Sequence, residues 1–149
     1  MNIGIRAAKA VIGGALLLLL AACASGPQFS QIESGLTAPA SDRGRIFVYR
    51  TAVFGAAIQP SVKVNGETVG TAAPQGVFYI DRPPGTYKIS TTTEVTRSVS
   101  LTLEAGEMRY VRLGVSLGFL VGHVYPELVD ASVGSSEIKD CHFMGSQAK

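Results

Sequence analysis

The stretch TYKISTTTEVTRSVSLTL, residues 86–103, decides the fold class of this chain. In its first half, Tyr87 and Ile89 alternate with polar side chains, and residues 98–103 alternate valine and leucine with serine and threonine in the same way. A strict period of two places one face of a strand against a core and leaves the other in water. The stretch therefore predicts two neighbouring strands of a half-buried sheet.

Similar short strands are predicted on both sides of this pair. Asn65-Gly66 stands between two apolar runs, which is the strongest local sign of a hairpin, because a type I′ turn needs positive φ at both central residues. Pro83-Pro84-Gly85 turns the chain before the quoted stretch. The further predicted strands are 45–50, 61–64, 67–69, 77–81 and 107–113.

Short strands separated by turn signals predict an all-β domain. We expect a small antiparallel β-sandwich of about seven strands, with a small barrel as the alternative. Residues 131–141 are expected to hold a short C-terminal helix, with a final strand as the alternative.

The N-terminal segment has the order of a secretory signal. Arg6 and Lys9 precede an apolar run over 10–22, which is short for a membrane span of ~20 residues and contains two glycines. Leu20-Ala21-Ala22-Cys23 then resembles the lipobox of bacterial lipoproteins. That resemblance implies cleavage before Cys23 and a lipid on its thiol. An ordinary signal peptide with a chance cysteine is the alternative.

Four parts of the chain follow from this interpretation. They are a signal peptide over 1–22, the lipidated Cys23 with a flexible tether over 23–43, a β-domain over 44–143 and a disordered tail over 144–149. The tether is predicted because small and polar residues dominate it without apolar periodicity. Ala24 follows the lipidated cysteine where an inner-membrane retention signal would have Asp, so we expect the outer membrane, in its periplasmic leaflet or at the surface.

Charge and cysteine content argue against a nucleic-acid-binding protein and against a fold held by an intramolecular disulfide. The whole chain has 13 Lys and Arg against 11 Asp and Glu, and both excess basic residues lie in the predicted signal peptide. The mature part is therefore neutral, which excludes a basic surface for nucleic acid. With Cys23 lipidated, Cys141 has no intramolecular partner, so the fold depends on its apolar core. We expect Cys141 to be buried, with pairing between chains as the alternative.

The domain also resembles a known kind of module. The motifs V-x-V-N-G-E, P-P-G-T-Y and V-S-L-T-L-E-A-G-E, within 62–113, are similar to those of PEGA-type β domains. The wider stretch 45–141 resembles an uncharacterised family of small envelope lipoproteins. These resemblances imply a β fold and a binding role, and they supply no catalytic residues.

Catalytic and metal-binding residues are not expected. His123, His142 and Cys141 could form a zinc site only if the fold gathered them, because paired ligand spacing is missing. His123 and Glu127 would share a helix face, but Pro126 between them disfavours a helix. We therefore predict no enzyme, no metal and no cofactor.

Two features are candidates for binding. The first is a set of arginines on predicted strands, Arg45, Arg50, Arg109 and Arg112, which could bind the anionic groups of lipopolysaccharide or peptidoglycan. The alternative is that they form an ordinary solvated face.

The second candidate is LGVSLGFLVGHV, residues 113–124, in which Gly114, Gly118 and Gly122 recur every four residues. A helix with this spacing would pack closely against another helix. A strand end followed by a Gly-rich loop is favoured, because each glycine inside a helix costs ~1 kcal/mol. Exposed apolar residues there would mark an interaction surface.

The sequence thus predicts an outer-membrane lipoprotein that acts as a binding module. Its partner would be an envelope protein, peptidoglycan or lipopolysaccharide, reached through a sheet face or the Gly-rich loop. The first alternative is a periplasmic inhibitor of a lytic hydrolase, which would need a rigid protruding loop with a carboxylate or lysine. The alternative of another class is a small hydrolase or metal enzyme.

Overall fold

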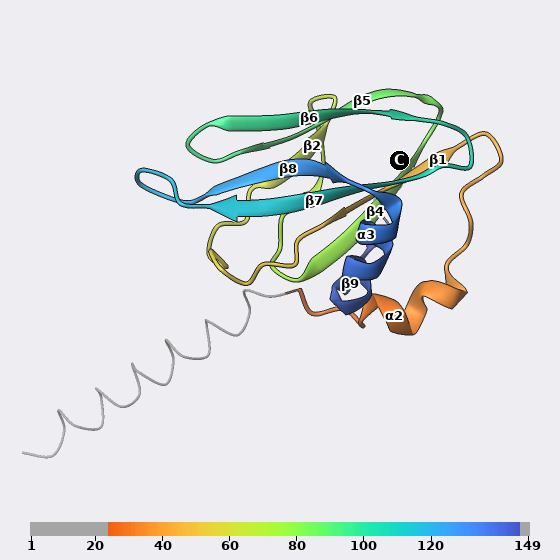
Figure 1. Cartoon of the computed structure of the whole chain (residues 1–149), viewed down its shortest axis with the longest axis horizontal. Coiled ribbons are helices and arrows are strands. Elements are labelled where there is room, and N and C mark those ends of the chain that lie inside the picture. Colours follow the sequence, from red (N-terminus) through yellow and green to blue (C-terminus); the bar gives the residue numbers. More distant parts are fainter. Residues whose placement is uncertain (1–23, 147–149) are drawn as a thin grey trace, which may run out of the picture.

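The computed structural model describes residues 24–146, which form nine strands in two sheets with short helices on one side (Figure 1). The all-β prediction is confirmed, with two strands more than predicted. In chain order the elements are α2 (Phe29–Ile32), η2 (Glu33–Gly35), β1 (Gly44–Tyr49), β2 (Ser61–Val64), β3 (Glu67–Thr71), β4 (Gly76–Arg82), β5 (Gly85–Thr92), β6 (Thr96–Leu103), β7 (Met108–Ser116), β8 (His123–Val129), α3 (Ala131–Glu137), η3 (Ile138–Asp140) and β9 (His142–Ser146).

The two sheets differ in strand direction. The four-stranded sheet has the order β3-β2-β5-β6, and all of its pairs are antiparallel. The five-stranded sheet has the order β8-β7-β1-β4-β9, and its pairs β1·β7 and β4·β9 are parallel. The prediction of a purely antiparallel sandwich is therefore wrong for this sheet. Long segments of the chain separate β1 from β7 and β4 from β9, so both strands of each pair begin at the same end of the sheet. A short hairpin would instead make the two strands antiparallel.

The core lies between the sheets. Ile46 and Val48 of β1 and Val111 of β7 face Ile89 and Leu103 of the other sheet, and all five are buried. Ile89 and Leu103 are apolar positions of the period-two pattern, so the alternation predicted for residues 86–103 has its expected cause. The hairpin turn is also confirmed, because Asn65 has φ 49° and Gly66 has φ 88°.

β1 is buried on both faces. Phe47 and Tyr49 point away from the sandwich core into a second apolar cluster with Phe29, Tyr110 and Ile138. The rings of Phe47 and Tyr110 are stacked with their centroids 5.2 Å apart. The helical segments α2, η2, α3 and η3 lie on this side of the five-stranded sheet (Figure 1). The continuous run of apolar residues in β1 reflects this double burial.

The flexible tether predicted over 23–43 is wrong for residues 28–36, whose apolar side chains pack on the domain. Phe29 is 3% exposed and makes an edge-to-face contact with Phe47, with ring centroids 5.6 Å apart. Gln28 forms a bridge with His142, and Phe29 N–H donates to Cys141 O at 2.8 Å. One apolar ring in a polar sequence fixes this segment, and composition alone gives no sign of it.

The C-terminal prediction is partly confirmed. Residues 131–141 hold the short helix α3 and the turn η3, as expected. The domain boundary at 143 and the disordered tail from 144 are wrong as far as 146, because β9 continues to Ser146 and pairs with β4. Residues 147–149 lie outside the described residues, as does the signal peptide with Cys23.

β8 was not predicted, because Pro126 interrupts its sequence. The strand forms the edge of its sheet, where a proline removes no hydrogen bond that the ladder needs. Among the described residues, no helix is both long and apolar enough to cross a membrane.

Candidate functional site

The two ends of the sandwich differ sharply in character. β1 and β7 run in parallel toward one end of the sandwich, where β4 begins at Gly76; β7 continues to Ser116, beyond Arg112, which pairs with Tyr49. We call this place the loop end, and it comprises the connections 50–60, 72–75, 93–95 and 117–122. The opposite end, the charged end, comprises the connections 42–43, 65–66, 83–84, 104–107 and 130. The loop end lies on the left in Figure 1.

The loop end carries most of the exposed apolar side chains. Seven of the ten large apolar residues that are exposed in the described chain belong to its connections. Leu117, Phe119 and Leu120 at the tip of the β7–β8 hairpin are 82%, 94% and 83% exposed. The other four are Val53, Phe54, Val95 and Val121. Exposed apolar clusters are typical of interaction surfaces, so the loop end is the candidate site.

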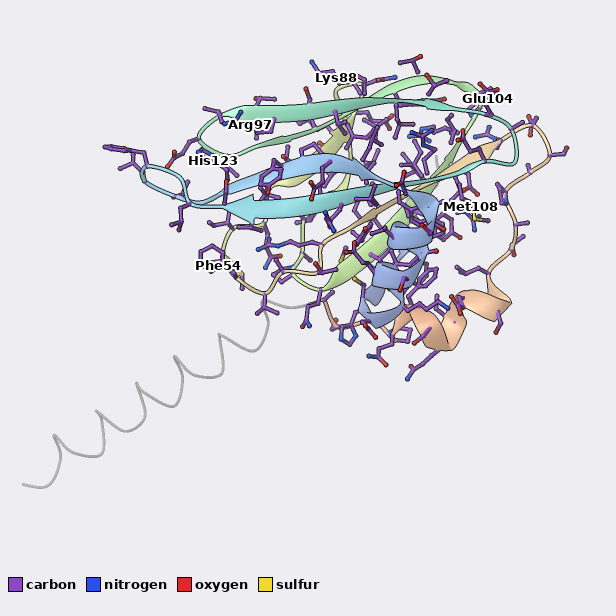
Figure 2. All side chains as sticks on the ribbon, viewed as in Figure 1. Phe54, Lys88, Arg97, Glu104, Met108 and His123 are labelled. Carbon is purple, nitrogen blue, oxygen red and sulfur yellow. The ribbon has the colours of Figure 1, made fainter. Side chains whose placement is uncertain are left out.

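Charged residues are distributed in the opposite way. The loop-end connections contain only two, Arg50 and Glu94, and Arg50 is fully buried. The charged-end connections contain five, which are Asp42, Arg43, Glu104, Glu107 and Asp130. In Figure 2, Phe54 and His123 lie at the loop end, and Glu104 and Met108 lie at the other.

Glu94 holds the backbone of the apolar hairpin tip. Its carboxylate accepts hydrogen bonds from the N–H groups of Phe119 at 3.1 Å, Leu120 at 2.5 Å and Val121. These donors would otherwise have only water as a partner. The tip is therefore fixed by the β5–β6 turn of the other sheet, and its side chains project from a rigid backbone.

The same contacts fix the ionisation of Glu94. Hydrogen bonds from the three N–H groups, that of Val121 foremost, hold the pKa of the Glu94 carboxyl below its usual value, because they favour the charged form. His123 stands beside it, with Nε2 3.7 Å from Oε2 of Glu94 and Nδ1 3.3 Å from the hydroxyl of Thr93. These contacts therefore favour the charged form of the carboxylate.

Gly118 is required by the tightness of the tip. A Cβ at this position would lie 1.7 Å from the carbonyl oxygen of Val121, which is well inside van der Waals contact. Gly122 also has a tight surrounding, because a Cβ there would lie 2.7 Å from Cδ1 of Ile58. Gly114, by contrast, lies within β7 against the ring of Tyr125. The favoured prediction, a strand end followed by a Gly-rich loop, is confirmed over 113–124.

Arg50 organises the neighbouring loop, residues 51–59. Its guanidinium donates to five carbonyl oxygens, those of Ala52, Phe54, Gly55, Ile58 and Ala72, at 2.7–3.2 Å. Burial lowers its pKa. The side chain is therefore a structural centre inside the loop, with no surface left for an anionic ligand.

The described chain also begins at the loop end. Ala24 N–H donates to the carbonyl of Pro74 at 3.1 Å, and the carbonyl of Gly26 lies 2.7 Å from Nδ1 of His142. Pro74 belongs to the 72–75 connection, whose Ala72 carbonyl binds Arg50. The first described residues and the exposed apolar loops therefore share one end of the sandwich.

The four arginines predicted to bind an anion do not form one site. Arg45, 3% exposed, makes two hydrogen bonds to Asp81 at 2.7 and 2.8 Å and stacks over Tyr79 at 3.8 Å. The bond to Asp81 raises the Arg45 pKa. Arg50 is enclosed by carbonyls, as described above.

Arg109 and Arg112 have carboxylate partners as well. Arg109 pairs with Glu107 at 3.1 Å, whereas Arg112 binds Glu127 and Glu137, each at 2.7 Å. The hydrogen bond to Glu127 raises the Arg112 pKa. Since these two positions of β7 have opposite parity, their side chains lie on opposite faces of the sheet.

The histidines and the cysteine do not assemble either. His123 begins β8 and His142 begins β9, and these strands are the two opposite edges of the five-stranded sheet. Cys141 is buried, as expected, and burial raises its thiol pKa to about 12. Among the described residues, no three His, Cys, Asp or Glu side chains are placed to hold a metal ion.

A groove of about 360 Å³ crosses the outer side of the five-stranded sheet. Its floor contains Phe47 and Tyr110, and Glu33 and Lys139, 3.6 Å apart, stand at its rim. Its volume falls within the range of small-molecule sites. The charged residues that line the groove are already paired, Arg45 with Asp81 and Glu33 with Lys139.

Sequence reasoning identified the hairpin tip but missed what fixes it. No motif in the sequence distinguishes Glu94 from other acidic residues. Its hydrogen-bond partners lie 25–27 residues further along the chain. Val53 and Phe54 were also missed. A signal was present for them, since residues 51–60 contain no charged side chain.

Residues 40–124 match the model of a family described as "Protein of unknown function (DUF2846)". The match covers more than half of the chain, from just before β1 into the start of β8. No curated protein matches the chain. The predicted resemblance to a family without assigned function is confirmed at this level, while the PEGA-type and lipoprotein resemblances stay predictions.

Proposed function

We propose a function for this chain on one premise: it belongs to the DUF2846 family, whose description assigns no activity. The chain acts as a binding module of the bacterial cell envelope. A lipid on Cys23 anchors it to the outer membrane, and the loop end binds an apolar component of the envelope or an envelope protein.

One observation carries this proposal, namely a rigid apolar hairpin tip. Exposed apolar side chains on a mobile loop would lose much of their binding free energy to ordering. Here the backbone of Phe119, Leu120 and Val121 is already fixed by Glu94, so little ordering remains when a partner binds. Large exposed apolar residues also weaken solubility, so a role in binding accounts for them better than chance.

The location is supported by the order of the N-terminal segment. A charged start, an apolar run and Leu20-Ala21-Ala22-Cys23 stand in the order that lipid attachment needs. Two or three acyl chains hold a protein stably on a bilayer, whereas one does so only reversibly.

The alternatives have less support. An inhibitor of a lytic hydrolase would carry a carboxylate or lysine on its protruding loop, but residues 117–122 contain neither. The carboxylate of Glu94 is turned toward the backbone of the tip. A hydrolase or metal enzyme would need its histidines together, and His123 and His142 lie at opposite sheet edges.

Photo-crosslinking in intact cells tests the binding role. A photoreactive amino acid replaces Phe119 in the full chain, and a control chain carries it at Met108, which is 44% exposed at the charged end. We expect a specific product from position 119 that Leu120→Ser reduces and that position 108 does not form. Identical products from both positions, or none from position 119, contradict the proposal.

Labelling with radioactive fatty acid tests the anchor separately. The wild-type chain should incorporate label, and Cys23→Ser should abolish it. Continued labelling of the variant would refute lipid attachment at Cys23.

A further inference from the structure

We infer that the partner of the loop end is the lipid bilayer itself, so that the loop end docks into the same membrane surface that holds the proposed lipid of Cys23. The inference rests on the proposed function, because it names the partner of that surface. Leu117, Phe119 and Leu120 enter the interfacial layer of the bilayer, with Phe54 beside it.

The first argument is the position of the anchor. Ala24 N–H donates to the carbonyl of Pro74 at the loop end, and Ala24 directly follows Cys23 in the sequence. Since residues 28 and 29 are fixed on the domain, no free tether holds the domain away from the lipid. A lipid at Cys23 therefore brings the loop end close to the membrane.

The second argument is the distribution of charge. Moving charged side chains toward a bilayer costs free energy, and apolar side chains gain it. The hairpin tip, 117–122, and the 51–60 connection carry no charged residue, whereas the charged end carries acidic residues in several connections. The loop end therefore brings fewer charged side chains toward an apolar medium than the charged end does; Glu94 is hydrogen-bonded to the tip backbone, and Arg97 stands near the start of β6 (Figure 2).

The third argument concerns the backbone. An N–H group that loses water on entering lipid must have another hydrogen-bond acceptor. The tip residues Phe119, Leu120 and Val121 already donate to Glu94, which lies behind them in the β5–β6 turn. The tip can therefore exchange water for lipid without leaving these donors unpaired.

Docking at two points fixes the orientation of the domain. The lipid at Cys23 and the hairpin tip are separate attachments on one end, so the strands stand away from the membrane surface. The charged end then faces away from the bilayer, and the groove beside Lys139 stays open to the aqueous side.

Tryptophan fluorescence tests this inference, because the chain contains no tryptophan. Single variants Phe119→Trp and, as matched control, Met108→Trp are made in the lipidated full chain. Both are reconstituted into vesicles of phosphatidylethanolamine and phosphatidylglycerol, with or without bromine on the acyl chains. Both original residues are exposed, so neither replacement disturbs the core, and thermal melting verifies this.

We expect the Phe119→Trp emission to shift to shorter wavelength on reconstitution and to be quenched by brominated lipid. The Met108→Trp emission should show neither change. Leu120→Trp gives a second reading of the tip if the first variant is unstable. Quenching at neither position, or equal quenching at both, overturns the inference.

The result also separates this inference from the proposed function. A tip that is not quenched but crosslinks one envelope protein from position 119 refutes bilayer docking and leaves the binding module intact. A tip that is neither quenched nor crosslinked refutes both proposals.

Discussion

The loop end and the charged end are built from the same number of strands, yet they differ in how their connections are held. At the charged end, the connections are short turns with acidic and basic side chains in water, such as Glu107 with Arg109. At the loop end, longer connections are fixed from inside, by Arg50 in one loop and by Glu94 in another. Internal polar anchors leave the outer surface of these loops free for apolar side chains. The difference shows how a small domain can present an apolar surface on rigid loops.

Among variants that compare the two ends, we expect Arg50→Met to lower the free energy of unfolding most. Removing the guanidinium leaves up to five buried or partly buried carbonyl oxygens without this donor, so the free energy of unfolding should fall by ~3–5 kcal/mol, as measured by urea denaturation. The matched change at the charged end is Arg109→Met, which breaks a half-exposed pair and should cost ~0–1 kcal/mol. Equal losses would show that Arg50 is no special anchor.

We expect the next largest loss of stability from Gly118→Ala. Its Cβ would meet the backbone of Val121, so the tip must open, at a cost of ~1–3 kcal/mol in the free energy of unfolding. Gly106→Ala at the charged end meets no atom within 4 Å and carries only the strain of φ +75°, for which we expect ~1 kcal/mol. Thermal melting of the two variants compares these costs. A larger loss at Gly106 would contradict the tight packing of the tip.

A pH titration sharpens the comparison further. Because the pKa of Glu94 is lower in the folded chain than in the unfolded chain, its contribution to stability is present above the unfolded pKa. The contribution is lost as the pH falls through the folded pKa. Amide exchange of Phe119, Leu120 and Val121 should therefore become faster, relative to the core, in acid. Glu94→Gln should produce the same loss of protection near neutral pH.

Glu107→Gln is the control for this titration, since Glu107 accepts one backbone N–H, that of Glu104, at the charged end. It should leave the protection of the hairpin tip unchanged. Protection of the tip that does not depend on pH or on Glu94 would mean that another group holds it.

Substitutions at the hairpin tip should change stability least, although they should weaken binding to vesicles most. Phe119→Ser with Leu120→Ser removes two almost fully exposed side chains, so the free energy of unfolding should change by less than ~0.5 kcal/mol. Met108→Ser at the charged end serves as the control. The double variant should lose binding to vesicles in a flotation assay, and a large loss of stability instead would show that these residues pack on the domain.

Much of the fold could be predicted from the sequence because its signals are local. The period of two in residues 86–103 and the turn at Asn65-Gly66 depend only on near neighbours. β8 could not be predicted, because Pro126 is tolerated only at a sheet edge, and which strand forms an edge is a tertiary property. The arginines were misjudged for a related reason. Their partners, such as Asp81 for Arg45, lie on other strands.

The sequence by itself determined the β fold, the main hairpins, the Gly-rich loop and the order of the signals around Cys23. Only the tertiary structure decided that Phe29 fixes the N-terminal segment on the domain and that Glu94 fixes the tip. It also decided that Glu94, Arg50 and the first described residues, from Ala24, lie at one end of the sandwich. The physical reason is that alternation and turn propensity act between near neighbours, whereas a buried ring or a carboxylate finds its partners across the sheets, at separations that no local pattern encodes.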